Sequence, residues 1–176
     1  LVIYQQTGFI QSKNLGYEKE NVIQFDKEGA VTQNTGVFLQ EIKRIPGVVN
    51  ASAISQSAVQ TGGNSATYGI EWPGKTDKDL INFVLRNVDY DMIETLGIQI
   101  KEGRSFSGDF GSDSAKLIFN ETAIKVMGLK NPVGTNVRMW GEDMQILGVV
   151  KDFNIASLHE QIQPMVFRYD PESTTM

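Results

Sequence analysis

The chain has 176 residues, 40% of them hydrophobic and 21% charged, which is enough for one domain or two small subdomains without disulfides. A net charge of -5 and the lack of any basic run argue against nucleic acid or an anionic membrane surface as the main partner, because both are bound through clustered Lys and Arg. The absence of cysteine excludes disulfides and thiolate metal sites, and no stretch approaches the roughly 18 consecutive apolar residues of a membrane-spanning helix.

The first third of the chain predicts one strand-helix-strand unit behind an N-terminal helix. Residues 1–14 carry apolar residues in a loosely helical pattern. The apolar run at 21–26 predicts a strand, and a helix is expected at 34–45, where apolar residues recur at i, i+4 and i+7. A second strand at 48–55 completes a βαβ unit. The polar, glycine-bearing stretch 56–66 is interpreted as a loop at a subdomain boundary.

The middle of the chain alternates short strands with short helices. Strands are expected at 67–72, 82–88, 98–100, 116–119 and around 137–140. Asp89 and Asn120 can each cap the start of a helix, and Gly97 and Gly128 are placed to end these two helices. The serine-rich and glycine-rich stretch 103–114 is expected to be a long loop.

The stretch Met144–Phe167 reads as strand, turn, helix and strand. A tight turn at 141–143 leads into its first strand, which forms a hairpin with the strand before it. Ser157 and Glu160 have the spacing of a capping box at a helix start, and Pro164 ends that helix. The stretch therefore predicts a second βαβ unit, and two such units side by side make the split βαβ sheet of a ferredoxin-like subdomain.

Few residues indicate chemistry. His159 is the only histidine, and it lies on the polar side of a short helix, where a solvated or capping role is expected rather than catalysis. The loop carrying Asp109 and Asp113 could offer oxygens to Ca²⁺ with Ser107, Ser112 and Ser114, but it lacks the EF-hand pattern, and a hydrated surface loop is favoured. Asp152 is expected to tie its turn together through backbone N–H groups.

No nucleotide-binding motif is present, since neither GxxxxGK[ST] nor GxGxxG after a strand occurs. Trp72 and Trp140 lie at strand ends, where buried anchors are expected and exposed recognition residues remain the alternative. Asn50 and Asn120 each begin an N-x-[ST] triplet, a pattern that also arises by chance, and a helix-capping Asn120 would be a poor glycosylation acceptor. The sequence therefore predicts no catalytic, cofactor-binding or metal-binding residue.

Five segments, in order along nearly the whole chain, resemble one family. They are FIQSKNLGYEKENVI, LGIQIKEGRSF, LIFNETAIKVMG, NPVGTNV and GVVKDFNIASLHEQIQPMVF. Their order and spacing are similar to the MacB-like periplasmic core domain of FtsX/MacB-type ABC transporter permeases. The apolar start at residues 1–3, without an initiator Met or a signal-peptide pattern, suggests an excised fragment whose missing parts would be membrane helices on both sides.

The resemblance implies an α+β fold, with a ferredoxin-like (split βαβ) porter-type subdomain and an inserted mixed α/β second subdomain. It divides the chain into a membrane-proximal stalk helix at 1–14, a porter-like subdomain at 15–60 and 141–176, and an inserted subdomain at 61–140. It implies a non-catalytic, extracytoplasmic (periplasmic) domain of an inner-membrane permease subunit that transmits ATP-driven motion of membrane helices to export or handling of an envelope substrate.

The partners implied by the resemblance are an ABC ATPase subunit or domain, which would hydrolyse the ATP, and a second permease copy. A periplasmic adaptor or lipoprotein is a further possible partner, although sparse charge in the loops argues against an adaptor. The alternative is an extracytoplasmic sensor or ligand-binding module for a peptide or envelope stress, which a cleft lined by Tyr68, Trp72 and Phe83 would favour. A small hydrolase would have to depend on His159.

Overall fold

The computed structural model describes residues 16–18, 21–55, 66–154 and 161–172. The helices are α2 (Ala30–Gln33), α3 (Thr35–Lys43), α4 (Met92–Thr95), α5 (Glu121–Met127) and a 3-10 turn, η1 (Gly108–Phe110). The strands are β1 (Ala66–Thr67), β2 (Ile70–Glu71), β3 (Phe83–Val88), β4 (Ile100–Gly103), β5 (Lys116–Asn120), β6 (Asn136–Met139), β7 (Glu142–Val150) and β8 (Met165–Tyr169). Among these residues, none of the helices has both the length and the apolar character needed to cross a membrane.

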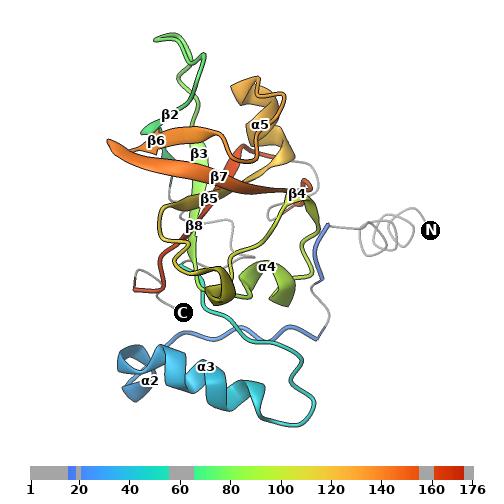
Figure 1. The fold of residues 1–176 in the computed structure, drawn as a ribbon. Helices are drawn as coiled ribbons and strands as arrows, with labels where there is room; N and C mark the ends of the chain where they lie inside the picture. The colour runs from blue at the N-terminus through green and yellow to red at the C-terminus, as the bar shows by residue number, and fades with distance from the viewer. Residues whose placement is uncertain (1–15, 19–20, 56–65, 155–160, 173–176) are drawn as a thin grey trace, which may run out of the picture.

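The strands form one mixed sheet in the order β1-β3-β8-β5-β7-β6-β2, with β4 also paired to β7 (Figure 1). Two neighbouring pairs are parallel, β3 with β8 and β5 with β7. Strand β5 lies between β7 and β8, and it is parallel to β7 but antiparallel to β8. Strands β7 and β8 therefore run in opposite directions, so the prediction of a compact βαβ unit at Met144–Phe167 is wrong.

The predicted α+β class is confirmed, but the ferredoxin-like detail is not. Residues 21–26 form no strand. The segment 48–55 contributes only one bridge, from Ile54 to Val88. Its helix is present as α3, but one flanking segment forms no strand and the other makes a single bridge, so the unit cannot supply half of a split βαβ sheet. Most of the other predicted helix, which follows residue 154, lies outside the described residues.

Both predicted parts of the chain contribute to this sheet. Strands β7 and β8 belong to the stretch 141–176, and they pair with β3, β5 and β6 from the stretch 61–140. Hydrogen bonding therefore continues across the expected boundary between residues 140 and 141. The division into a porter-like and an inserted subdomain stays a prediction, and the expected stalk at 1–14 lies outside the described residues.

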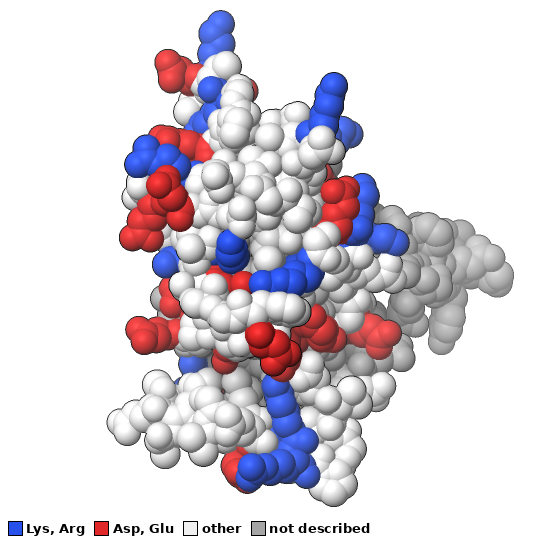
Figure 2. All heavy atoms as spheres, viewed as in Figure 1, with Lys and Arg blue, Asp and Glu red and all other residues white. Residues whose placement is uncertain are grey.

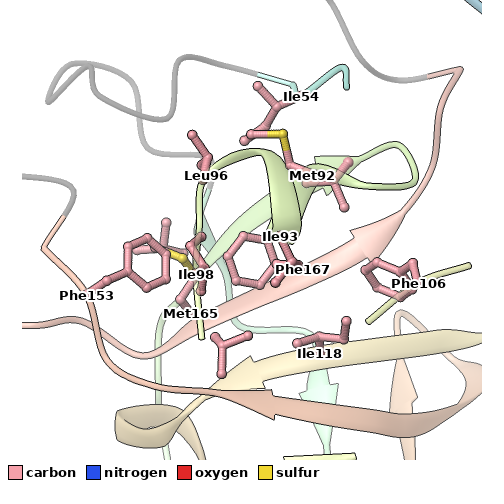
Figure 3. Close-up of a cluster of buried hydrophobic side chains, with 13 residues drawn as sticks. Ile54, Met92, Ile93, Leu96, Ile98, Phe106, Ile118, Phe153, Met165 and Phe167 are labelled. Carbon is pink, nitrogen blue, oxygen red and sulfur yellow. The ribbon is translucent and has the colours of Figure 1, made fainter. Parts of the chain in front are cut away.

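The two faces of the sheet carry two hydrophobic clusters, because successive side chains of a strand point to opposite faces. Within β5, Ile118 lies in one cluster, while Leu117 and Phe119 lie in the other. Helix α4 closes the first cluster through Met92 and Ile93, and Figure 3 shows these side chains gathered with those of β8. Helix α5 covers the second cluster. The sheet and its two short helices therefore form a packed body.

Candidate functional site

Residues 21–52, which we call the arm, contain no buried residue. In Figure 1 the arm's helices α2 and α3 lie apart from the sheet, on the side of α4. Six of the twelve exposed large hydrophobic residues among those described belong to this arm: Val22, Ile23, Phe25, Val37, Ile45 and Val49. An edge-to-face contact joins Phe25 to Phe38 within it, with ring centroids 5.9 Å apart. Burial therefore stabilises the arm little, which places it at the low end of local stability.

The arm meets the body through charged groups. Lys43, in the last turn of α3, pairs with Asp91 at 2.5 Å. Burial raises the pKa of the nearby Asp89 above its ordinary value, against the opposing effects of the Tyr90 N–H and of Lys43. Burial also lowers the pKa of Lys27, against the attraction of Asp89. Two lysines of the arm thus face two carboxylates of the body. Such contacts between partly exposed charges weaken as salt is added.

Hydrogen bonds to backbone carbonyls hold the end of the arm where it enters the body. The Ser52 hydroxyl donates to the Tyr90 carbonyl at 2.7 Å, and the Asp89 N–H donates to the Ala53 carbonyl at 2.9 Å. Ala53 and the following Ile54 are buried. The chain therefore becomes part of the packed core at residue 53, and the arm ends there.

The other end of the arm follows a second anchor. The Glu18 N–H donates to the Leu96 carbonyl at 2.8 Å, and the Tyr17 ring packs edge-on against Phe153. A Cβ placed on Gly16 would lie 2.8 Å from the Phe153 Cβ and 2.9 Å from the Asp152 carbonyl oxygen, so the chain passes directly against the backbone at these residues. The arm is therefore a segment fixed to one body at both of its ends.

The elbow after β7 is tied to the start of α5 by side chains. The Asp152 carboxylate accepts hydrogen bonds from the Thr122 N–H at 3.0 Å and the Thr122 hydroxyl at 2.7 Å. In return, the Asp152 N–H donates to Glu121 at 3.1 Å. Asn120 caps α5 by accepting from the Ala123 N–H. Asp152 has a structural role, as predicted, but its carboxylate bonds to the start of α5 and not to N–H groups of its own turn. The buried Asn120 cannot serve as a glycosylation acceptor.

Asp113 is part of an ion pair and not of a metal site. Both of its carboxylate oxygens accept hydrogen bonds from Arg104 at 2.8 Å, and one also accepts from the Ser107 N–H. Burial alone would raise the pKa of Asp113, but these hydrogen bonds outweigh it and hold the pKa below its ordinary value. In the part of the chain that the structure describes, no cluster of His, Asp and Glu could hold a metal ion.

The two tryptophans differ in environment. Trp72 is buried as predicted and packs edge-to-face on Phe83, with ring centroids 6.0 Å apart. Phe83 is buried as well, so these two residues belong to the core and do not line the cleft that a sensor was expected to use. The expectation of a buried Trp140 is wrong, because 55% of it is exposed. His159 lies outside the described residues.

Sequence reasoning missed the pairs that join distant segments. Arg104 and Lys43 carried no motif, and nothing in the local pattern connects Lys43 with Asp91, 48 positions later in the chain. Lys43 lies near Asp91 because the end of the arm, at Ser52 and Ala53, is hydrogen-bonded to the turn before α4. Only covariation between homologous sequences could have pointed to them in advance.

The fold is similar to solved extracytoplasmic domains of transport proteins. The periplasmic region of MacB from Actinobacillus actinomycetemcomitans matches with a TM-score of 0.52 and 15% identity, over 85% of this chain and 64% of that chain. A domain assigned to a permease protein from Porphyromonas gingivalis matches with a TM-score of 0.51 and 15% identity, over 80% of this chain and 60% of that chain. The extracellular domain of the ABC-type transporter YknZ from Gram-positive bacteria gives a TM-score of 0.49 and 14% identity, over 89% of this chain and 64% of that chain.

The expected likeness to MacB-like periplasmic domains is therefore confirmed at the level of the fold. The chain spans less than two thirds of the length of each of these solved domains. No family model matches the sequence, and no curated protein matches it.

Proposed function

We propose that this chain is an extracytoplasmic domain of an ABC-type permease subunit in the inner membrane. In this proposal it is non-catalytic and transmits movement of membrane helices, driven by an ABC ATPase, to the handling or export of an envelope substrate. The likeness in fold to the periplasmic region of MacB is the observation that carries the proposal. The partners would be the ATPase, a second permease copy and, where the system has one, a periplasmic adaptor or lipoprotein.

The contrast between body and arm supports a mechanical role. The body has hydrophobic clusters on both faces of its sheet, so it moves as a stiff unit. The arm has no buried residue and meets the body through charged side chains that can separate and pair again at little cost. A stiff body beside a weakly docked arm allows displacement between the two without unfolding either.

Location is tested by labelling single cysteines in the full-length protein in intact cells. The 176 residues contain no cysteine, so each introduced thiol is the only reactive one in this domain. Val49 is 99% exposed, and Val49→Cys is expected to react with a membrane-impermeant maleimide from outside the inner membrane. Val88→Cys, at a fully buried position, is the control and should react only after denaturation. Labelling of Val49→Cys only after the inner membrane is permeabilised would overturn the extracytoplasmic assignment.

Transmission is tested across the junction between arm and body. In membranes that contain the full permease with its ATPase, the double variant Lys43→Cys with Asp91→Cys is treated with a short bismaleimide. We expect the yield of cross-link to differ between the nucleotide-free and the vanadate-trapped states. The cross-link should also lower transport while leaving each single-cysteine variant active. Equal yields in the two states, together with unchanged transport after cross-linking, would refute a moving junction.

A further inference from the structure

Residues 16–18, which we call the strap, contact the body where two of its elements end. The Glu18 N–H donates to the carbonyl of Leu96, the C-cap of α4. Gly16 lies against the backbone at Phe153, in the elbow after β7. Leu96 and Phe153 both belong to the first hydrophobic cluster, where Figure 3 shows them. The strap is therefore anchored on the core of the body, ahead of the arm in chain order.

The strap lies unusually close to the body at two glycines. A Cβ on Gly97 would lie 2.7 Å from the Glu18 Cγ, and one on Gly16 would lie 2.8 Å from the Phe153 Cβ. Both glycines also have positive φ, +61° at Gly97 and +82° at Gly16. Between these two points the Tyr17 ring packs on the first cluster, with its centroid 6.3 Å from that of Phe153. The contact is therefore tight along all three residues.

The elbow that the strap touches is itself fixed to three elements. The Lys151 N–H, at the end of β7, donates to the Gln99 carbonyl just before β4 at 2.8 Å. The Asp152 N–H donates to Glu121 in the first turn of α5, and Glu121 also pairs with Lys101 of β4 at 2.6 Å. Direct contacts therefore lead from the strap to β4, β7 and α5. Contiguous packed and hydrogen-bonded groups of this kind carry coupling between distant parts of a protein.

Helix α3 of the arm is joined to the body less firmly. Six large hydrophobic residues of the arm are exposed, and α3 meets the body through the partly exposed pair of Lys43 and Asp91. Figure 2 shows basic side chains of the arm lying against acidic side chains of the body. Such pairs separate at little cost, whereas lifting the strap breaks a backbone hydrogen bond and exposes an aromatic ring. A displacement that enters before residue 16 thus reaches the body before it reaches the arm.

We propose that the strap is the coupling point of this domain, at which displacement of the preceding chain is passed to the body while α3 of the arm is left free to shift. This inference rests on the proposed function, in which membrane helices drive the domain. Tyr17 is then a positioning residue that holds the strap on Phe153. Strap and body move as one unit, and the change in contact falls between Lys43 and Asp91.

The anchoring of the strap is tested on the 176-residue chain by amide hydrogen exchange. Tyr17→Ala is expected to speed exchange of the Glu18 amide about fivefold, because the ring contact that holds the strap is lost. Exchange in β5 should stay at the wild-type rate, which shows that the body remains folded. Tyr68→Ala is the control, because it removes a 60% exposed ring from the β1–β2 loop, and it should leave the Glu18 amide unchanged. An unchanged Glu18 rate in Tyr17→Ala would overturn the role of Tyr17.

Coupling is tested in membranes that contain the full permease and its ATPase. The readout is the difference in cross-linking of Lys43→Cys with Asp91→Cys between the nucleotide-free and the vanadate-trapped states. Adding Tyr17→Ala should abolish this difference while ATP hydrolysis continues, and adding Tyr68→Ala should preserve it. A difference that persists in Tyr17→Ala would overturn the coupling point. A wild type without any difference would instead contradict the moving junction of the proposed function.

A disulfide tests whether the strap stays closed. The Glu18 Cβ lies 3.4 Å from the position of a Cβ on Gly97, close to the separation that a disulfide spans. Replacing both residues by Cys also removes the clash with the Glu18 Cγ. In the full permease this disulfide should form equally in the two nucleotide states and should leave ATP hydrolysis at the level of the single-cysteine variants. A yield that depends on the nucleotide would show that the strap opens, and the proposal would be wrong.

Discussion

Replacing Asn120 with Ala should be among the most damaging single changes in the body. The side chain is buried, and its Oδ1 accepts hydrogen bonds from the Ala123 N–H and the Met165 N–H, both at 2.9 Å. Its Nδ2 donates to the Gln163 carbonyl at 3.0 Å. One side chain thus caps α5 and positions the start of β8.

The magnitude follows from these contacts. Loss of a helix cap costs about 1 kcal/mol. Each of the two other backbone groups left without a partner adds about 1–2 kcal/mol. We therefore expect Asn120→Ala to lower the free energy of unfolding by about 3–5 kcal/mol, measured by urea denaturation followed by circular dichroism. For a chain of this size, the melting temperature should fall by about 10 °C or more.

The same residue type at a comparable position provides the control. Asn34 is the N-cap of α3, but its side chain makes no capping hydrogen bond and is exposed. Asn34→Ala should change the free energy of unfolding by less than about 0.5 kcal/mol. A loss below about 1 kcal/mol in Asn120→Ala, or equal losses in the two variants, would refute the reasoning that burial and three hydrogen bonds decide the cost.

The remaining predictions concern other parts of the fold. The hydrogen bonds of Asp113 keep its pKa in the folded state below the ordinary value. The ionised Asp113 should therefore stabilise the folded state fully above about pH 4, and this contribution should be lost as the pH falls through the lower pKa of the folded state. Asp113→Asn should flatten this dependence in acid titrations of stability. Gly103→Ala should lower the free energy of unfolding by about 2–4 kcal/mol in urea denaturation, because φ is +74° and a Cβ would lie against a backbone carbonyl oxygen. Gly36→Ala, in α3, should raise the free energy of unfolding by up to about 1 kcal/mol, because a Cβ there meets open space. Lys43→Ala removes the ion pair to Asp91 and should speed hydrogen exchange of the α3 amides severalfold without affecting the amides of β5. In the wild type, about 1 M NaCl should speed exchange of the α3 amides in the same way. An unchanged rate in α3 would contradict the ionic docking of the arm.

Local signals in the sequence predicted the elements whose residues interact with near neighbours. Asn120 and Gly128 bound α5 as expected, because a cap bonds to residues within one helical turn. The strands β3, β5 and β8 were recognised from apolar runs that burial on both faces requires. The segment 21–26 has the same apolar character, but it finds no neighbouring strand and stays exposed.

The sequence by itself determined the α+β class, the cap of α5 and the absence of any nucleotide-binding motif, because each of these follows from composition or from residues close together in the chain. The cap expected at Asp89 is wrong, since the N-cap of α4 is Asp91, whose side chain makes no capping hydrogen bond. Only the tertiary structure decided the strand order, which sets β5 between β7 and β8 and thereby reverses the direction expected for β8. It also decided the pairing of Asp113 with Arg104 and the exposure of Trp140 at a turn. The physical reason is that strand neighbours, ion pairs and burial arise from packing between distant segments, and local periodicity carries no information on which distant segments meet.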